Sequence, residues 1–445
     1  MVKDLTKGTP WRVLLSLSLP MLVSVAFQQM YNIADSVIAG KYAGENALAE
    51  VGASYPITMI FMAIAIGSNV GCSVLVSKLF GQKEMGKMKT AIYTALLTAF
   101  GLAVVLVLAG VLLSGVFLDL LETPEVVRTN AIAYLQIYIA GFLFLYVYNV
   151  VTGIFTSLGD SITPLGLLIG SSIGNIVLDL LFVIQYHWGV PGVAWATFVA
   201  QGMACVIALG ILLVRLKKVE TREPLCLYSW NMLKQIARVA IPSILQQSFV
   251  SVGNLFVQVL INQSGENVIA GYSAAIKLNT FAITSFATIG NGVSSFTAQN
   301  VGAAKYQRIR KGFRAGAIMA LAIGTVFFVC YFGFSRQTIG LFMSEDTMKE
   351  EALQTGISFL KIVTPFYFVV ALKLLADGVL RGTSSMKYFM ITTFTDLILR
   401  VGLAYLFFPI FRVMGIWYSW PIGWIVGMVL SLLFYDMVVK RLMKE

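Results

Sequence analysis

PMLVSVAFQQMYN at residues 20–32 and PSILQQSFVSVGN at residues 242–254 follow one pattern, about 220 residues apart. Each stretch opens on a proline, runs through apolar residues and ends on an asparagine. The first leads into Gly-Glu-Asn-Ala at residues 44–47, and the second leads into Gly-Glu-Asn-Val at residues 265–268. The second half of the chain therefore restates the first.

The repeat continues beyond these two stretches, in the same order along each half. The matched positions are Ile66, Gly67 and Val70 with Ile289, Gly290 and Val293, then Gly81 with Gly302, and Gly153 with Gly378. Duplicated membrane halves place a binding site at the interface between them. The repeat alone thus favours a carrier.

Composition places this chain in a membrane. Hydrophobic residues make up 58% and charged residues only 12%, far outside the range of a soluble domain. Apolar runs long enough to cross a bilayer recur along the whole length. We expect twelve spans: 13–38, 53–79, 91–118, 131–155, 162–185, 192–215, 235–262, 270–298, 313–334, 353–380, 387–411 and 416–438.

A hydrocarbon core holds no water for backbone groups, so the spans must be helices. A β-barrel is excluded, because the apolar runs are too long and lack period-2 alternation. The predicted fold class is therefore an all-α integral membrane protein, with twelve transmembrane helices in two six-helix lobes. Six spans in each half make the repeat parallel, with a pseudo-two-fold axis along the membrane normal.

The formal charge of +11 is explained by membrane orientation rather than by nucleic acid. Most of the 32 Lys and Arg residues fall in loops on the side of the N-terminus, and few fall in loops on the other side. The positive-inside bias predicts a multi-pass protein of the cell membrane with both termini in the cytoplasm. The predicted division is an N-terminal lobe at 1–215, a cytoplasmic linker at 216–234 and a C-terminal lobe at 235–445.

Polar residues within the first-half spans form the main candidate site. An Asp in a membrane helix is costly and persists only where it faces a cavity or a partner. Asp35 and Asn32 share a face of the first span, and Asp179 and Asn175 share a face of the fifth. Thr197 lies near the start of the sixth, and the positions of Asp35, Asp179 and Thr197 along their spans place all three in the outer half of the bilayer.

Two carboxylates, two amides and a hydroxyl form a hard-oxygen set suited to Na⁺ or to a bound proton. Burial and mutual repulsion of Asp35 and Asp179 should favour a bound proton on one of them. A coupling ion and an organic cation would then compete for the same acids, as antiport requires. The alternative is that these residues only bond neighbouring helices together.

Spans of the second half carry a further set of charges. Lys373 and Asp377 have i, i+4 spacing on the tenth span, and so do Asp396 and Arg400 on the eleventh. Each pair can form on its own helix, and a four-member network can join them. One interpretation is a cytoplasmic gate or part of a proton route. The other is a static ion-pair network that holds the lobe together.

The motifs quoted above, with Ala-Gln-Asn-Val-Gly-Ala-Ala at residues 298–304, resemble the MATE family of multidrug and toxic compound extruders. The resemblance covers nearly the whole chain. Asn175, Asp179 and a Thr 18 residues later, Thr197, are similar to the cation-binding pattern of the DinF-like branch. Gln246 and Gln247 stand on the seventh span, where the NorM-like branch has a glutamate. The resemblance implies cation-coupled export of small molecules.

We therefore expect a secondary active antiporter that exports amphiphilic, often cationic, small molecules in exchange for H⁺ or Na⁺. One alternative is a flippase for lipid-linked saccharides, and another is an integral membrane enzyme. The chain has one His and no phosphate-binding loop of the ATPase type, so we expect neither an enzyme nor an ATP-driven pump. No cofactor is expected, nor any metal beyond Na⁺ at Asp35, Asn175 and Asp179. The partners are the solute and the lipid bilayer, with no nucleic acid, and a monomer suffices for the mechanism.

Overall fold

The computed structural model describes residues 3–42, 47–121, 123–221, 225–343 and 350–444. Its side chains are described throughout these ranges except at residues 34–42, 47–51, 53, 126 and 127. The described chain is helical along nearly its whole length, and no strand occurs in it. This composition agrees with the requirement that a membrane-spanning backbone satisfy its own hydrogen bonds.

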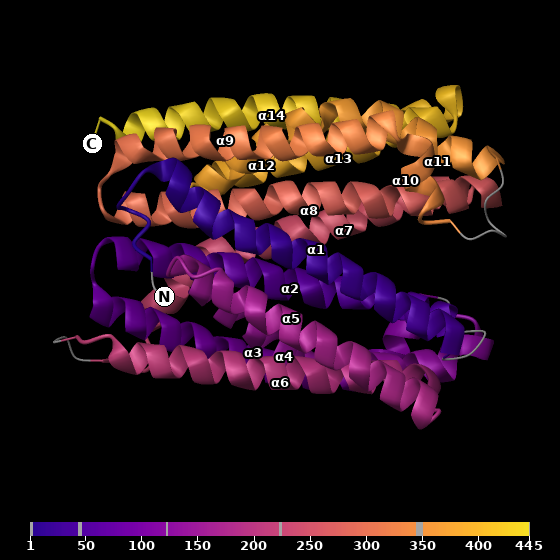
Figure 1. Ribbon diagram of the computed structural model, residues 1–445, viewed down its shortest axis with the longest axis horizontal. Coiled ribbons are helices and arrows are strands. Elements are labelled where there is room, and N and C mark those ends of the chain that lie inside the picture. Colours follow the sequence, from indigo (N-terminus) through magenta and orange to yellow (C-terminus); the bar gives the residue numbers. More distant parts are fainter. Residues whose placement is uncertain (1–2, 43–46, 122, 222–224, 344–349, 445) are drawn as a thin grey trace. The chain divides into compact units, whose positions relative to one another are not determined.

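Long helices run side by side within each half of the chain (Figure 1). The first half contains α1 (Pro10–Tyr42), α2 (Ala47–Gly81), α3 (Met85–Leu120), α4 (Glu125–Ser157), α5 (Ile162–Asp179), the π-helix η1 (Leu180–Gln185) and α6 (Gly189–Lys218). The second half contains α7 (Trp230–Asn262), α8 (Glu266–Gly302), α9 (Tyr306–Phe328), the π-helix η2 (Val329–Gly333), α10 (Ser335–Gly340), α11 (Glu350–Val363), the 3₁₀ turn η4 (Thr364–Phe366), α12 (Tyr367–Gly382), α13 (Met386–Phe411) and α14 (Val413–Leu442).

The predicted fold class is confirmed, because each of the twelve expected spans falls on a long helix or on a run of helical segments. Within the described residues, eleven helical segments are long and apolar enough to cross a membrane. The exception is α8, which is long enough but carries many polar residues. Several of these are buried, including Asn279, Ser285 and Thr288, so protein rather than lipid surrounds them.

Three of the expected spans are interrupted helices rather than regular ones. The fifth changes from α-helix to π-helix after Asp179, and the ninth does so after Phe328. The tenth is divided by a 3₁₀ turn that contains Pro365, whose ring removes a backbone hydrogen bond. The short helix α10 lies between two expected spans, in a stretch where the sequence predicted only a loop.

The chain forms two compact units. Unit 1 comprises Met1–Asp4 and Leu19–Ser248, and unit 2 comprises Leu5–Ser18 and Phe249–Glu445. The expected division assigned all of the first helix to one lobe and all of the seventh to the other. In the structure, the start of α1 packs in unit 2 and the first part of α7 packs in unit 1.

Glycines on α2 explain why the first part of α7 belongs to unit 1. A methyl group at Gly67 would lie 2.7 Å from the Cα of Ile244, and one at Gly71 would lie 2.8 Å from the Cα of Ala240. The α7 backbone therefore packs directly on α2, at a separation that side chains would prevent. In unit 2, Gly292 of α8 makes similar room for Ser18 of α1.

The N-terminal segment is held on unit 2 by the motif at residues 298–304. Gln299 Oε1 accepts a hydrogen bond of 2.9 Å from the Leu5 amide, and Asn300 Oδ1 accepts one of 2.9 Å from Arg308. Arg308 also donates to the Gly8 carbonyl over 2.9 Å. These contacts give part of the motif a structural role, because they satisfy backbone groups ahead of α1.

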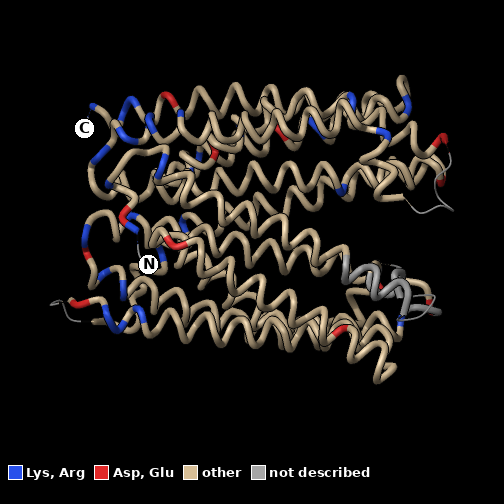
Figure 2. Tube along the Cα trace, viewed as in Figure 1, with Lys and Arg blue, Asp and Glu red and all other residues tan. Residues whose placement is uncertain are grey.

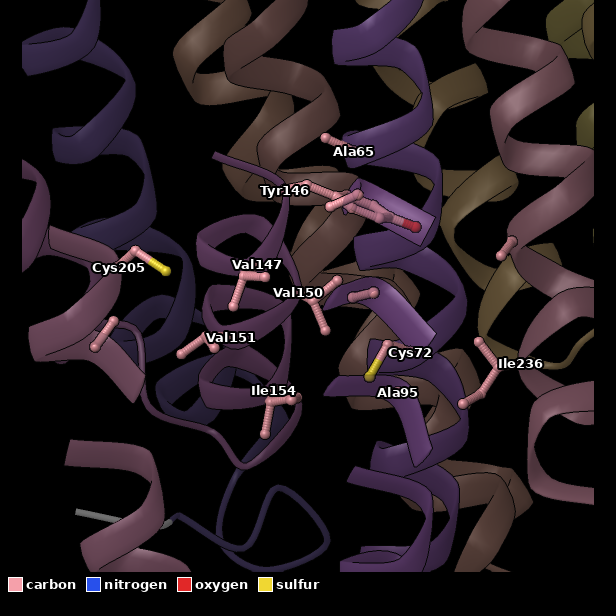
Figure 3. Close-up of a cluster of buried hydrophobic side chains, with 14 of the residues drawn as sticks. Ala65, Cys72, Ala95, Tyr146, Val147, Val150, Val151, Ile154, Cys205 and Ile236 are labelled. Carbon is pink, nitrogen blue, oxygen red and sulfur yellow. The ribbon is translucent and has the colours of Figure 1, made fainter. Parts of the chain in front are cut away.

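Buried apolar side chains fill the interior of unit 1 (Figure 3). Val150, Val151 and Ile154 of α4 pack there with the thiols of Cys72 and Cys205, which are both buried. The thiols take the place of small apolar groups in this core. Many charged residues lie near the helix ends within each unit, and others lie along the helices of unit 2 (Figure 2).

The helix pairs α2–α4 and α8–α12 repeat one close contact. A methyl group at Gly153 on α4 would lie 2.7 Å from the Asn69 Oδ1 of α2. A methyl group at Gly378 on α12 would lie 3.0 Å from the Gly290 carbonyl carbon of α8 and would overlap the carbonyl oxygen. The sequence match of Gly153 with Gly378 is therefore also a match in packing.

Candidate functional site

Asp179 occupies a special position at the end of α5. It is the last residue of the α-helix, it is fully buried, and the π-helix η1 begins at the next residue. A π-helical turn widens the helix by one residue and occurs frequently at functional sites. Asn175, one turn earlier on the same face, is also buried, with 2% of its surface exposed.

Thr197 on α6 lies opposite this face of α5. The Asn175 side-chain amide donates a long hydrogen bond of 3.4 Å to the Thr197 hydroxyl. The structure thus places Asn175 and Asp179 on one helix face and joins Asn175 to Thr197 on the next helix. These are three of the five residues that the sequence singled out in the first half.

A small apolar cluster lies next to these polar groups along α5, η1 and α6. Val183 lies four residues after Asp179, and Val193 lies four residues before Thr197. Both are buried and pack together with Ile176. Because these valines extend the same two helices, the carboxylate, amide and hydroxyl lie beside apolar packing rather than bulk water.

Asn32 and Asp35, the two predicted site residues on α1, are not placed in this group by the described structure. Asn32 is exposed, and its side-chain nitrogen donates a hydrogen bond of 3.3 Å to Gln29 Oε1 on the same helix. The Asp35 side chain lies outside the described part of the structure. The described portion of the site therefore consists of Asn175, Asp179 and Thr197.

Carboxylate, amide and hydroxyl oxygens are hard ligands, and they suit Na⁺ or a proton better than a soft metal. A buried carboxylate is costly unless a cation, a proton or hydrogen bonds compensate its charge. A cation bound at Asp179 would supply that compensation. The π-helical turn that presents this side chain carries no sequence signal that we recognised, because the residues of η1 read as ordinary apolar span.

Lys373 is the centre of the charged cluster in unit 2. Its ammonium lies 3.1 Å from Asp377 Oδ2 and 3.3 Å from Asp396 Oδ2, with 5% of the side chain exposed. The other oxygen of Asp377 accepts hydrogen bonds from Thr392 over 3.1 Å and from Ser431 over 2.7 Å. The expected i, i+4 contact of Lys373 with Asp377 is present, and Lys373 also reaches the next helix.

The second expected pair, Asp396 with Arg400, does not form. Asp396 contacts Lys373 instead, and Arg400 makes no ion pair with any carboxylate in the described part of the chain. Arg400 donates to Asn254 Oδ1 over 3.4 Å and lies 4.5 Å from the ring centroid of Trp420. Tertiary packing brings α12 close enough for Lys373 to replace the partner on the same helix.

Two glycines on α14 make room for the Lys373 cluster. A methyl group at Gly427 would lie 2.7 Å from Lys373 Cε, and one at Gly423 would lie 2.8 Å from Asp396 Oδ1. These glycines and the Ser431 and Thr392 hydroxyls were not predicted from the sequence. A regular spacing of small residues at 423, 427 and 431 was the available signal.

Comparison with known proteins gives a consistent family. The MatE family profile matches residues 20–181 and 242–406, so each half carries one match and each match begins at the proline of the repeat. A Bacillus subtilis protein named probable multidrug resistance protein YpnP is 27% identical over 383 residues, which cover 86% of this chain and 85% of that protein. YoeA of the same organism, also named a probable multidrug resistance protein, is 24% identical over 446 residues, covering 98% and 96%.

A solved structure has the same fold. A transporter of the MOP superfamily from Pyrococcus furiosus superposes with a TM-score of 0.92 at 24% sequence identity. The match covers 99% of this chain and 98% of that one. The two profile matches span well over half of the sequence, so this chain belongs to the MatE family of multidrug efflux transporters and is a multi-pass membrane protein.

Proposed function

We propose that this MatE-family chain is a secondary active antiporter whose coupling ion, H⁺ or Na⁺, binds in unit 1 at Asp179. The observation that carries this proposal is the fully buried Asp179 at the α5–η1 junction, one turn from the contact of Asn175 with Thr197. An acid at this position favours a bound cation strongly, because nearby apolar packing reduces its hydration. In this proposal Asp35 and Asn32 complete the site from α1.

Antiport follows from competition for one negative charge. With the coupling ion bound, the acid is neutral in effect and holds an organic cation weakly. Without the ion, the carboxylate attracts a cationic solute, so each ligand displaces the other. In this proposal the exported solutes are amphiphilic and often cationic, because a carboxylate attracts a cationic group. Alternating access of two six-helix lobes then couples ion entry to solute exit.

The remaining assignments complete the proposal. The basic loops on the side of the N-terminus set both termini in the cytoplasm. A single copy contains both units, so a monomer suffices for the cycle. The pattern of Asn175, Asp179 and Thr197 supports a place in the DinF-like branch as part of this proposal. The Lys373 cluster serves as a static network that joins α12, α13 and α14, because its carboxylates are already engaged by Lys373 and two hydroxyls.

Purified protein in proteoliposomes tests this function. Export of a fluorescent organic cation is measured under a pH gradient alone, and then under a Na⁺ gradient alone. We expect one of the two gradients to drive export, and Asp179→Asn to reduce the driven rate to that of empty liposomes. Asp436→Asn, at a half-exposed acid of α14 that pairs with Arg310 and Lys440, is the matched control and should retain the rate. Full gradient-driven export by Asp179→Asn would contradict the proposal.

A further inference from the structure

The turn before α5 recurs before α13 with the same backbone. Gly159 and Ser384 both have positive φ, at 75° and 59°. The next amide in each turn, that of Asp160 or Ser385, donates to a carbonyl five residues earlier, over 2.9 Å and 2.8 Å. Positions in α5 and α13 therefore correspond at a constant offset of 225 residues, the offset from Gly153 to Gly378.

This register pairs the candidate site residues of α5 with residues of opposite character. Arg400 of α13 stands at the position of Asn175, and Ala404 stands at the position of Asp179. Both helices are regular α-helices between the matched turns and these residues, so no insertion disturbs the correspondence. Unit 2 therefore has a methyl group where unit 1 has the Asp179 carboxylate, and a cation where unit 1 has the Asn175 amide.

The other members of the site correspond as well. Gly192 of α6 approaches Phe182, and Gly415 of α14 approaches Phe407, which lies at the matching position of α13. Five residues after these glycines stand Thr197 and Trp420. On α1 and α7, counting from the matched prolines, Asn32 corresponds to Asn254 and Asp35 to Val257.

The second-half counterparts meet in unit 2. Arg400 contacts both Asn254 and Trp420, at the 3.4 Å and 4.5 Å given above. Val257 and Ala404, which stand at the positions of the two acids, are both fully buried. Unit 2 therefore contains the counterpart of the candidate cation site, with both acids removed and a guanidinium introduced.

The Arg400 guanidinium has hydrogen-bonding capacity that the described part of the protein leaves unused. The residue is 8% exposed, and its Nε has no hydrogen-bond partner among the described residues. Asp396, the acid one turn away on α13, directs one oxygen to Lys373, and Tyr272 of α8 is a further neighbour of the guanidinium. A buried guanidinium with one weak amide contact is stabilised by an oxyanion, which its planar fork binds through two parallel hydrogen bonds.

We propose that Arg400, with Asn254 and Trp420, forms a second site in unit 2 that binds the carboxylate or phosphate group of a transported amphiphile. This inference rests on the proposed transport function and adds a solute class to it, namely zwitterionic and acidic amphiphiles. Asn254 is exposed and gives the site an accessible edge, and the buried Trp420 ring packs against the guanidinium and holds it in place. The coupling ion has no acid to bind at this position of unit 2.

Equilibrium binding to the purified full-length protein tests the site independently of ion coupling. The probes are a zwitterionic rhodamine with a free carboxylate and the methyl ester of the same dye, followed by fluorescence anisotropy. We expect Arg400→Gln to weaken binding of the carboxylate dye about tenfold or more, because a hydrogen bond to a charged group is lost. The ester should bind with unchanged affinity. Arg400→Lys keeps the charge but loses the planar fork, so it should fall between the parent and Arg400→Gln.

Arg412→Gln is the matched control, because it removes one exposed positive charge from the turn between α13 and α14. It should leave both affinities unchanged. Equal weakening of both dyes by Arg400→Gln would indicate a purely structural residue, and unchanged binding of both would exclude the site. If Arg400→Gln changed only the amount of anionic phospholipid that stays bound to the purified protein, Arg400 would bind a lipid headgroup. That result would also overturn the proposal. Absence of gradient-driven export would instead contradict the antiport function and leave the binding result standing.

Discussion

The α5–α6 region of unit 1 and the α13–α14 region of unit 2 share an entry turn and a helix contact but differ in chemistry. Both begin at a turn with a positive-φ residue, and both pack a glycine of the following helix against a phenylalanine. Unit 1 places a buried acid, an amide and a hydroxyl at the matched positions, and unit 2 places Ala404, Arg400 and Trp420 there. The comparison teaches that duplication preserved the packing positions while the polar side chains diverged.

The buried ion pairs of unit 2 lie at positions that do not correspond to the candidate cation site of unit 1. Lys373, Asp377 and Asp396 correspond by the same offset to Tyr148, Thr152 and Ser171 of unit 1, which are uncharged. Each of these charged residues thus stands opposite an uncharged residue in the other unit. A cluster whose charges engage one another suits a fixed structural role, whereas the Asp179 site of unit 1 suits an exchangeable ion.

Removing the central cation of unit 2 should have the largest effect. Lys373→Met leaves Asp377 and Asp396 buried without their shared partner, and breaking a buried ion pair costs about 3–5 kcal/mol. Tyr148→Phe at the matched position of unit 1 should change stability far less. Thermal unfolding of the purified variants, followed by tryptophan fluorescence, measures both. Equal unfolding midpoints for Lys373→Met and the parent would show that the cluster does not stabilise unit 2.

The matched glycines should differ in their tolerance of a methyl group. At Gly378 the new Cβ meets the Gly290 backbone, which cannot move aside, so Gly378→Ala should cost about 1–3 kcal/mol through overpacking. At Gly153 it meets the Asn69 side chain at 2.7 Å, and the nearest backbone atom, the Asn69 carbonyl oxygen, is farther away at 3.1 Å, so Gly153→Ala should cost less. Unfolding midpoints of the two variants give the order directly. The reverse order would show that the α2–α4 contact is the tighter one.

Acid sensitivity should lie in the α4–α5 turn of unit 1. Burial raises the pKa of Asp160, but hydrogen bonds from Arg215 and Thr163 outweigh burial and lower its pKa below the ordinary value. A lowered folded-state pKa means that this contribution is complete above the unfolded pKa of about 4 and is lost as pH falls through the folded pKa. Asp160→Ser introduces the residue type of the matching position 385 and should cost about 1–2 kcal/mol at neutral pH.

The measurement is the unfolding midpoint as a function of pH, with Ser385→Ala as the control in unit 2. The parent should lose stability in acid, and Asp160→Ser should lose less. Parallel pH curves for the parent and Asp160→Ser would locate the acid sensitivity elsewhere.

The smallest expected effect is at Thr197. Thr197→Val removes the hydroxyl that Asn175 contacts. It should lower the affinity for the coupling ion by about three- to tenfold, the range for one neutral hydrogen bond. Thr197→Ser keeps the hydroxyl and should restore most of the affinity. Trp420→Phe, at the matched position of unit 2, should leave ion dependence unchanged. The ion concentration giving half-maximal export measures all three, and an effect of Trp420→Phe equal to that of Thr197→Val would remove the distinction between the units.

Prediction from sequence succeeded where long-range pattern suffices. Apolar runs predicted the twelve spans, and the spacing of Lys373 and Asp377 predicted their contact. It failed for Asp396 and Arg400, because helix spacing brings two residues within reach but does not exclude a better partner on a neighbouring helix. The short helix α10 and the π-helical turns were not expected, since their residues read as loop or as ordinary span.

Span length and the internal repeat are properties of the linear chain, so residue order alone specified a duplicated bundle of membrane helices with a few costly polar groups inside. Only the tertiary structure decided that the start of α1 packs in unit 2 and the first part of α7 in unit 1, and that Lys373 serves two acids. It also placed Arg400 beside Asn254 and Trp420. These outcomes depend on which helix surfaces approach closely, and glycines at single positions permit that approach.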